Sequence, residues 1–377
     1  MNRRAIAAVA VIAAAWAVIV PLDRALADHD MVQARRAAFG AANVDDSGAV
    51  RADRVILSWF GVTNFAAAIG GHVVLLDAWV PRGEYSGYVP ATPASLAALE
   101  PEYIIAGHSH FDHLADAAEI ITASGATLVG TPEQCGQVRR QAGLTPVQCI
   151  ESSAPGSAPG AQRDLTGDLG WANVAVTAVK HVHSAGRQPH PEDPHTPAAP
   201  PPDMGAVVEH RPAPQDTIHL VSHLGDAENG TVLYQFRVGA FSLLWNDSAG
   251  PLSDDAPGVF DVLRGLPPTD VQVGAIMGFN QITNGMRDPR MYIEAIRPKV
   301  FVPSHHDNWA PPVSTRATCR LATSRCIISS RAHRGARRSF CAWPGTTPSR
   351  SSSATAPWRH GWWMTPRTPR RATIRWA

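Results

Sequence analysis

The stretch His108-Ser109-His110-Phe111-Asp112-His113 decides the fold, because it places four ligand-type side chains within six residues. It follows the apolar run Tyr103-Ile104-Ile105-Ala106, typical of a buried strand, and precedes residues 114–124, whose apolar side chains have helical spacing. Side chains alternate along a strand, so His108 and His110 point the same way and can bind one metal ion. The turn that follows directs Asp112 and His113 toward a second ion.

The remaining ligands must come from later in the chain, because two clustered pairs cannot complete two coordination spheres. His183 ends a strand predicted over residues 174–183, but His181 faces the same way and alternation does not separate the two. Asp247 stands where a strand runs into a turn, where it can bridge two cations or instead form an Asx-turn. His305 follows the apolar run 300–302, again at a strand end. Imidazole and carboxylate suit zinc, and also iron or manganese.

This pattern resembles the metallo-β-lactamase superfamily, whose hallmark, His-x-His-x-Asp-His, is intact at His108 to His113. The later elements of the family look like His183, Asp247 and His305, so that the resemblance covers roughly residues 55–312. Asn246 departs from the family, which usually has glycine there. The ligand sets that the resemblance implies are His108, His110 and His183 for one metal ion, Asp112, His113 and His305 for the other, and Asp247 as the bridge.

The resemblance also implies hydrolysis with two metal ions. Ions about 3.5 to 4 Å apart would lower the pKa of a bridging water toward neutrality, and the resulting hydroxide would attack a carbonyl or phosphoryl centre, oriented by Asp112. Asp247 together with His113 points away from the true β-lactamases, which lack that aspartate, and toward an esterase, lactonase or phosphodiesterase acting on a small or lipid-like substrate. The alternatives are an iron oxidoreductase resembling sulfur dioxygenases, and an inactive binding protein.

Strands and helices alternate in both halves of the chain. This alternation predicts two mixed sheets packed face to face with helices outside, a four-layer αββα sandwich, over residues 51–312. Thr92 is the expected N-cap of the first of these helices, with Pro93 at its first position. Strands are expected at 55–57, 64–66, 73–77, 103–106, 174–183, 231–236, 241–245, 274–277 and 300–302, and helices at 93–100, 114–124, 258–263 and 289–296.

Composition narrows the class of protein further. The 377 residues carry a net charge of +1, which gives no overall field to attract nucleic acid, and a hydrophobic content of 45%, which suits a globular core. Cys135 and Cys149 can form a disulfide in an oxidising compartment or serve as two small buried apolar residues. The sequence contains no Cys-x-x-Cys pair, which argues against a structural zinc ribbon.

The sequence of residues 1–27 predicts an N-terminal export signal. Arg3 and Arg4 precede an apolar run over residues 5–20, which is short for a membrane span of about 20 residues, and Ala25-Leu26-Ala27 offers a cleavage site. We therefore expect an exported protein, in the periplasm, cell envelope or medium, with no stable membrane span after cleavage. Residues 28–50 would form an N-terminal extension, and the proline-rich residues 187–215 a long surface loop over the site.

The character of the sequence changes in residues 313–377. From Asn308 onward there is no Asp, Glu or Lys, whereas there are thirteen arginines, six tryptophans and three cysteines, with no period that fits a strand or helix. One interpretation is a basic aromatic tail for nucleic acid or lipid. The interpretation that we favour is translation of a GC-rich gene in the wrong frame after a change near codon 313, which would leave the tail without a function.

Overall fold

The computed structural model describes residues 29–80, 91–187, 213–278, 281–305, 361–364 and 375–376. The predicted signal peptide, residues 188–212 of the proline-rich loop and most of the tail lie outside the described residues. The N-terminal extension forms a helix over residues 29–39 and the short 3-10 helix η1 (Ala41–Asn43).

The first sheet is mixed and, within the described residues, has eight strands. Its first three long strands form an antiparallel meander, and the next three are parallel with helices between them. In spatial order the strands are β16 (Arg375–Trp376), β15 (Gly361–Met364), β1 (Val55–Trp59), β2 (Phe65–Ile69), β3 (His72–Leu76), β4 (Tyr103–Ile105), β5 (Thr127–Gly130) and β6 (Cys149–Glu151).

The second sheet is also mixed and has six strands in the part of the chain that the structure describes. The consecutive strands from β7 to β10 each pair with the next in antiparallel orientation. β10 pairs with β11, and β11 with β14, in parallel orientation. In spatial order the strands are β14 (Val300–Ser304), β11 (Val271–Ala275), β10 (Phe241–Asn246), β9 (Thr231–Val238), β8 (Val174–His181) and β7 (Gln162–Asp164).

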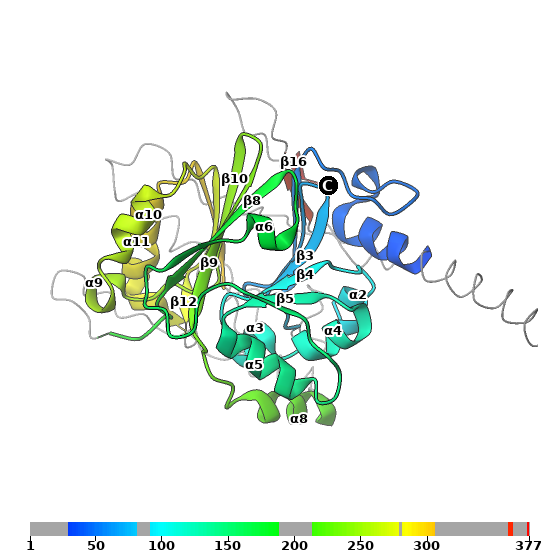
Figure 1. The fold of residues 1–377 in the computed structure, drawn as a ribbon, viewed down its shortest axis with the longest axis horizontal. Helices are drawn as coiled ribbons and strands as arrows, with labels where there is room; N and C mark the ends of the chain where they lie inside the picture. The colour runs from blue at the N-terminus through cyan, green and yellow to red at the C-terminus, as the bar shows by residue number, and fades with distance from the viewer. Residues whose placement is uncertain are drawn as a thin grey trace, which may run out of the picture.

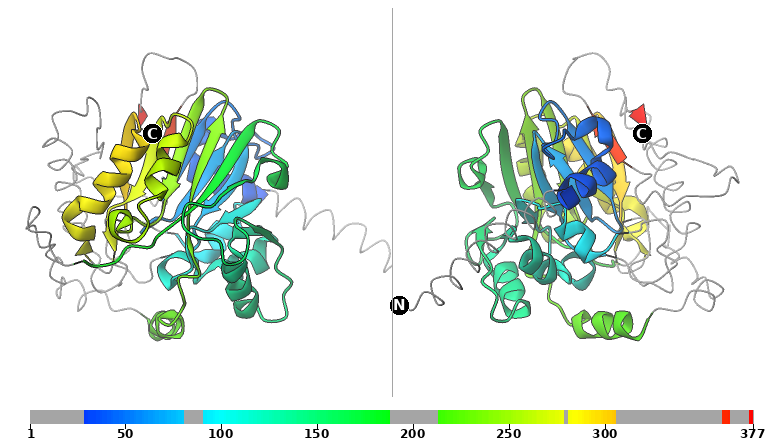
Figure 2. Two further views of the ribbon diagram at one scale, coloured as in Figure 1. Left: turned by 60° about the vertical axis from the view of Figure 1, so that its left-hand side comes forward. Right: turned by 90° about the vertical axis from the view of Figure 1, so that its right-hand side faces the viewer.

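The two sheets face each other with helices on both outer sides, which confirms the predicted four-layer αββα sandwich (Figures 1 and 2). Alternation along β1 shows the principle: Ile56 packs outward against helices, whereas Val55 and Leu57 pack inward between the sheets. The covering helices are α2 (Pro93–Ala97), α4 (Ala117–Ser124) and α5 (Pro132–Gln141) on the first sheet, and α9 (Leu252–Asp255), α10 (Val259–Gly265) and α11 (Arg287–Ile296) on the second.

Local signals explain where several elements begin. Thr92 caps α2 as predicted, because its hydroxyl accepts a hydrogen bond from the Ser95 backbone at 3.1 Å while Pro93 occupies the first turn. Thr131 does the same for α5 through the Gln134 backbone at 3.2 Å. The remaining elements are α3 (Phe111–Leu114), α6 (Thr166–Leu169), α8 (Pro214–His223), β12 (Met277–Gly278), β13 (Gln281–Ile282) and η3 (Thr283–Met286).

The expected helix over residues 114–124 begins later than predicted, as α4 at Ala117, and residues 111–114 form the separate short helix α3. The backbone N–H of Asp116 donates to the Ala78 carbonyl at 3.0 Å, and the Asp112 carbonyl accepts from the Asn64 side chain at 3.1 Å. Tertiary hydrogen bonds therefore use the groups that a continuous helix would have paired with each other. The expected strand over 174–183 also ends early, at His181.

The tail departs from its expected lack of structure at two short segments. Residues 361–364 pair with β1 and residues 375–376 pair with β15, both antiparallel. An edge strand presents unpaired backbone groups that another segment can satisfy through its own backbone. Such pairing needs no alternating side-chain pattern, which is why sequence periodicity did not indicate it.

A disulfide joins Cys135 in α5 to Cys149 in β6, with 6.1 Å between the Cα atoms. Of the two alternatives that the sequence left open, the structure therefore has the cross-link. None of the helices in the described ranges combines the length and the apolarity that crossing a membrane requires.

Candidate metal centre

The motif covers the end of the connection from β4 to α3 and the first three residues of α3, at the edge where the strands of both sheets end. Its loop is held at Ser109, whose backbone N–H donates to the Glu228 carbonyl at 3.0 Å and whose hydroxyl donates to the Ala227 carbonyl at 2.8 Å. The Gln137 side chain donates to the Ser109 carbonyl at 2.9 Å. Contacts on every side of Ser109 thus fix the backbone that carries the neighbouring histidines.

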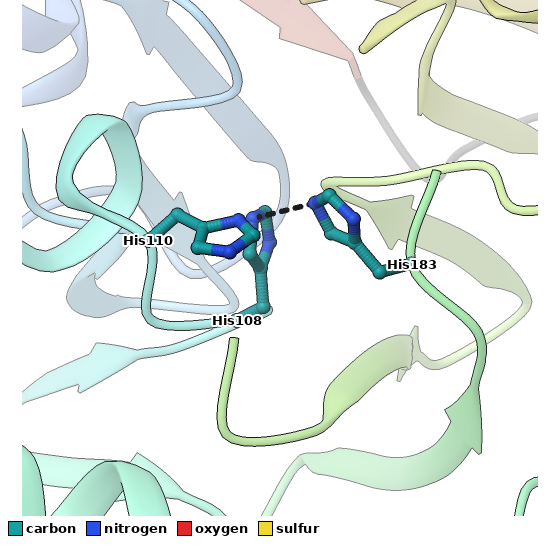
Figure 3. A group of neighbouring side chains, drawn as sticks. All are labelled: His108, His110 and His183. Carbon is teal, nitrogen blue, oxygen red and sulfur yellow. Dashed lines mark hydrogen bonds between the residues drawn. The ribbon is translucent and has the colours of Figure 1, made fainter. Parts of the chain in front are cut away.

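His108, His110 and His183 converge in space and are called here the three-histidine group (Figure 3). One ligand atom from each lies within 4.8 Å of the other two. The Nε2 atoms of His108 and His183 are 3.1 Å apart, and Figure 3 shows the His183 ring reaching across from a separate segment. His108 is buried, whereas the other two are half-buried.

Asp112, His113 and His305 converge beside it and are called here the aspartate group. The Asp112 Oδ2 atom lies 3.4 Å from Nε2 of His305 and 3.6 Å from Nε2 of His113. All three residues are buried. His305 has a left-handed backbone with φ of 49°, and its N–H donates to the Val62 carbonyl at 2.9 Å.

Asp247 touches one residue of each group, through the Nδ1 edges of the two rings. Its Oδ2 atom lies 2.5 Å from Nδ1 of His108 and 3.4 Å from Nδ1 of His113. Gly107 makes this approach feasible, because a Cβ there would collide with the Asp247 carboxylate. Asn246, the departure from the family pattern, holds the turn by donating to the Ser248 carbonyl at 2.9 Å.

Asp77 completes the centre and was missed from the sequence. Its Oδ2 atom lies 2.7 Å from Nδ1 of His113 and accepts from the Thr63 hydroxyl at 2.8 Å, and its Oδ1 atom accepts from the Gly107 N–H at 3.0 Å. A carboxylate on the far nitrogen of a ligand histidine orients the ring and fixes its tautomer. The available signal was its place after the apolar strand β3, the parallel neighbour of β4.

The structure separates the two histidines that alternation left open. His183 enters the three-histidine group, whereas Nδ1 of His181 lies 2.8 Å from the hydroxyl of Tyr292 in α11, on the outer side of the second sheet. Because β8 ends at His181, the chain has left the sheet by His183 and strand alternation no longer sets its direction.

Burial governs the protonation of the centre. It lowers the pKa of His108 and His113 well below the ordinary value and that of His183 to about 3, so these imidazoles are neutral at pH 7. Burial alone would raise the pKa of Asp112, but the neighbouring His113 and His305 bring it below its usual range. Neutral imidazoles with free electron pairs are the form that binds metal ions.

Burial also raises the pKa of Asp77 and Asp247 well above the ordinary value, and the charge of Asp247 adds to the effect on Asp77. The carboxyl groups of Asp77, Asp112 and Asp247 thus lie close together in a buried centre. The buried Oδ1 atom of Asp247 has no hydrogen-bond partner among the described residues. Divalent cations would offset this charge and use the unpaired oxygen. The donor set thus fits metal ions.

The αββα sandwich, with this motif at the end of β4, defines a protein of the metallo-β-lactamase superfamily, as the resemblance implied. No family model matches the sequence. A protein of Pyrobaculum calidifontis described as a UPF0173 metal-dependent hydrolase is 33% identical over 253 residues, which cover 67% of this chain and 84% of that protein. One of Pyrobaculum arsenaticum with the same description is 30% identical with the same coverage. The chain therefore belongs to the UPF0173 metal-dependent hydrolase family.

Of two further comparisons, one is shorter and the other has a lower sequence identity. A UPF0173 metal-dependent hydrolase of Pyrobaculum neutrophilum is 32% identical over 101 residues, so that the match spans 43% of that protein and 27% of this chain. Among solved structures, Igni18, a metallo hydrolase of Ignicoccus hospitalis, is similar with a TM-score of 0.49 and 16% identity, covering 80% of this chain and all of that chain.

Proposed function

We propose that this metal-dependent hydrolase uses two divalent metal ions, with zinc as our choice, to cleave an ester, lactone or phosphodiester. The observation that carries the proposal is the adjacency of the three-histidine group and the aspartate group, each with three ligand-type side chains. A single ion would leave one of these two groups without a partner. Nitrogen and carboxylate donors in sets of three, with positions left for water or substrate, are typical of catalytic zinc sites.

In this proposal each group holds one ion. Asp247, whose Oδ2 atom contacts His108 of one group and His113 of the other, offers its unpaired Oδ1 atom as the bridging ligand. When bound, the pair of ions lowers the pKa of water enough to supply hydroxide near neutral pH and polarises the oxygen of the substrate's carbonyl or phosphoryl group. The chain's own residues then have distinct tasks. Asp247 and Asp77 orient the rings of His108 and His113.

Asp112 orients the attacking water. The neighbouring histidines hold its pKa below the usual range, so the carboxylate stays ionised and accepts a hydrogen bond from water at working pH. The half-buried His110 and His183 mark the open side of the centre, where a substrate can approach. Because an aspartate, Asp247, accompanies His113, we place the chain outside the true β-lactamases.

The test is a hydrolysis panel with zinc-loaded full-length protein and its His110→Ala variant. Bis-p-nitrophenyl phosphate, an aryl ester, a lactone and a cephalosporin are offered as substrates. We expect turnover of at least one of the first three, loss of that turnover in the variant, and none with the cephalosporin. Cephalosporin hydrolysis alone, or equal turnover by the variant, would contradict the proposal.

We propose further that the chain is exported after cleavage behind Ala27. The Cys135–Cys149 disulfide supports this proposal, because disulfides persist in oxidising compartments. Expression in a bacterial host followed by mass measurement of the periplasmic fraction tests it. A chain beginning at Asp28 is expected, and a full-length chain retained in the cytoplasm would refute export.

A further inference from the structure

An asparagine outside both groups holds the backbone that follows His183. The Oδ1 atom of Asn284 accepts from the Arg187 backbone N–H at 2.8 Å, and its Nδ2 atom donates to the Ala185 carbonyl at 3.0 Å. One side-chain amide thus forms hydrogen bonds with the backbone at both residue 185 and residue 187, as a neighbouring strand would. This pair of hydrogen bonds is called here the bracket. The bracket begins two residues beyond the histidine of the three-histidine group.

The amide of Asn284 is fixed in orientation. Its Nδ2 atom donates a second hydrogen bond, at 2.6 Å, to Oδ2 of Asp288, which is 1% exposed. Arg287 in turn donates from Nε to the other oxygen of Asp288 at 2.7 Å. Both N–H groups of the amide have acceptors and its oxygen has a donor, so turning the amide over would place oxygen against oxygen.

The backbone around Asn284 is held in an unusual conformation. Asn284 has φ of 45° and Met286 has φ of 76°, both in the left-handed region that favours glycine. Asparagine tolerates this region better than most residues, but the conformation persists only where surrounding contacts maintain it. The left-handed turn directs the Asn284 amide toward the backbone that follows β8, so this unusual conformation allows the two hydrogen bonds of the bracket to form.

His183 depends on such contacts because it lies beyond the last residue of β8. Two further contacts help: the Ser184 N–H donates to the Ser248 hydroxyl at 2.9 Å, and Gly250 passes so close to the His183 carbonyl that a Cβ would collide with it. Gly250 lies against the His183 carbonyl, Ser248 holds the N–H of the next residue, and Asn284 fixes the chain just after it. The exit of the chain is therefore anchored from two separate segments.

We propose that Asn284 is a positioning residue for His183, and through it for the metal ion of the three-histidine group. This inference rests on the proposed function. Loss of the bracket would leave residues 185–187 free to move and would relax the His183 ring, while the aspartate group would keep its geometry. The effect on metal binding should therefore fall on one ion only.

The test compares Asn284→Gly with Arg297→Gly. Glycine keeps the left-handed backbone in both variants, and Arg297, also left-handed with φ of 53°, is exposed at the far end of α11. Zinc is titrated into metal-free full-length protein against a chromophoric chelator. We expect Asn284→Gly to weaken the binding of one zinc ion by roughly tenfold, which is the usual effect of losing a residue that orients a ligand. The affinity for the other zinc ion should stay unchanged. Arg297→Gly should match the wild type.

A second measurement does not depend on metal. Imidazole ¹H–¹⁵N spectra of the metal-free protein, assigned with His183→Gln, should show the His183 signals shifted or broadened in Asn284→Gly and unchanged in Arg297→Gly. Unaltered His183 signals and zinc affinities, even with a lower melting temperature, would overturn the proposal and leave Asn284 a structural residue. A wild type that fails to bind two zinc ions would refute the two-metal function instead, and the spectra would still decide the role of Asn284.

Discussion

The three-histidine group and the aspartate group are adjacent but differ in charge and exposure. The first contains only imidazoles, and two of them are half-buried, whereas the second contains the ionised Asp112 and is buried throughout. A cation gains more from a buried carboxylate than from a third imidazole, because the low dielectric strengthens their attraction. If each group holds one ion as proposed, we expect a firmly held ion at the aspartate group and an accessible one at the three-histidine group.

Asp112→Asn should have the largest effect, because it removes the carboxylate on which the contrast depends. The amide keeps the shape but has no charge, so we expect the ion of the aspartate group to be lost and turnover to fall by about 10²–10⁴-fold. Metal content and steady-state rates measure both effects. Asp261→Asn, on the exposed face of α10, is the matched control. Normal zinc content in Asp112→Asn would show that charge does not distinguish the groups.

The next effect concerns the two histidines at the end of β8. His183→Ala should lose the ion of the three-histidine group and retain that of the aspartate group, with turnover at least tenfold lower. His181→Ala should bind both ions but lose its contact with Tyr292, at a cost to stability of about 1–3 kcal/mol. Zinc stoichiometry and urea unfolding separate the outcomes. The assignment is wrong if His181→Ala is the variant that loses an ion.

A smaller effect is expected at Asp77, which contacts the ring of His113 and no residue of the three-histidine group. Asp77→Asn should weaken the ion of the aspartate group by roughly 10–100-fold. Asp164→Asn, at the exposed end of β7, is the control. Competition with a chelator measures the affinity. A selective loss at the three-histidine group would reverse our account of which carboxylate serves which group.

The smallest effect concerns pH in the metal-free protein. Burial lowers the pKa of His181 and His183 to about 3, whereas an unfolded histidine titrates near 6.5. Below about pH 6.5 these histidines bind protons in the unfolded chain but not in the folded chain, which favours unfolding. The free energy of unfolding is therefore highest above that pH and decreases as the pH falls toward about 3. Unfolding midpoints from pH 7.5 to 4.5 should fall, with a shallower slope in His181→Gln. Identical slopes would show that His181 does not titrate as described.

Local sequence patterns predicted much of the fold and of the metal centre. The strand before His108 and the apolar runs before Asp247 and His305 each mark a strand end, and strand ends meet at one edge of the sandwich. Such features are predictable because they depend on neighbours in sequence. The same reasoning located the cap of α2 at Thr92.

Features that depend on distant partners were not predictable. Asp77 follows β3 like many surface aspartates, and only the pairing of β3 with β4 brings it to His113. Alternation could not separate His181 from His183, because the pattern says nothing about where β8 ends. The spacing of Cys135 and Cys149 likewise contains no information on whether their Cβ atoms approach.

The central claim, two ion sites of unequal character at the end of the sandwich, is tested most directly by counting zinc. The full-length protein is loaded with excess zinc, passed through a desalting column and measured by mass spectrometry of the metal, alongside His110→Ala. The account predicts two zinc ions per chain in the wild type and one in the variant. One ion or none in the wild type, or two in the variant, would contradict it.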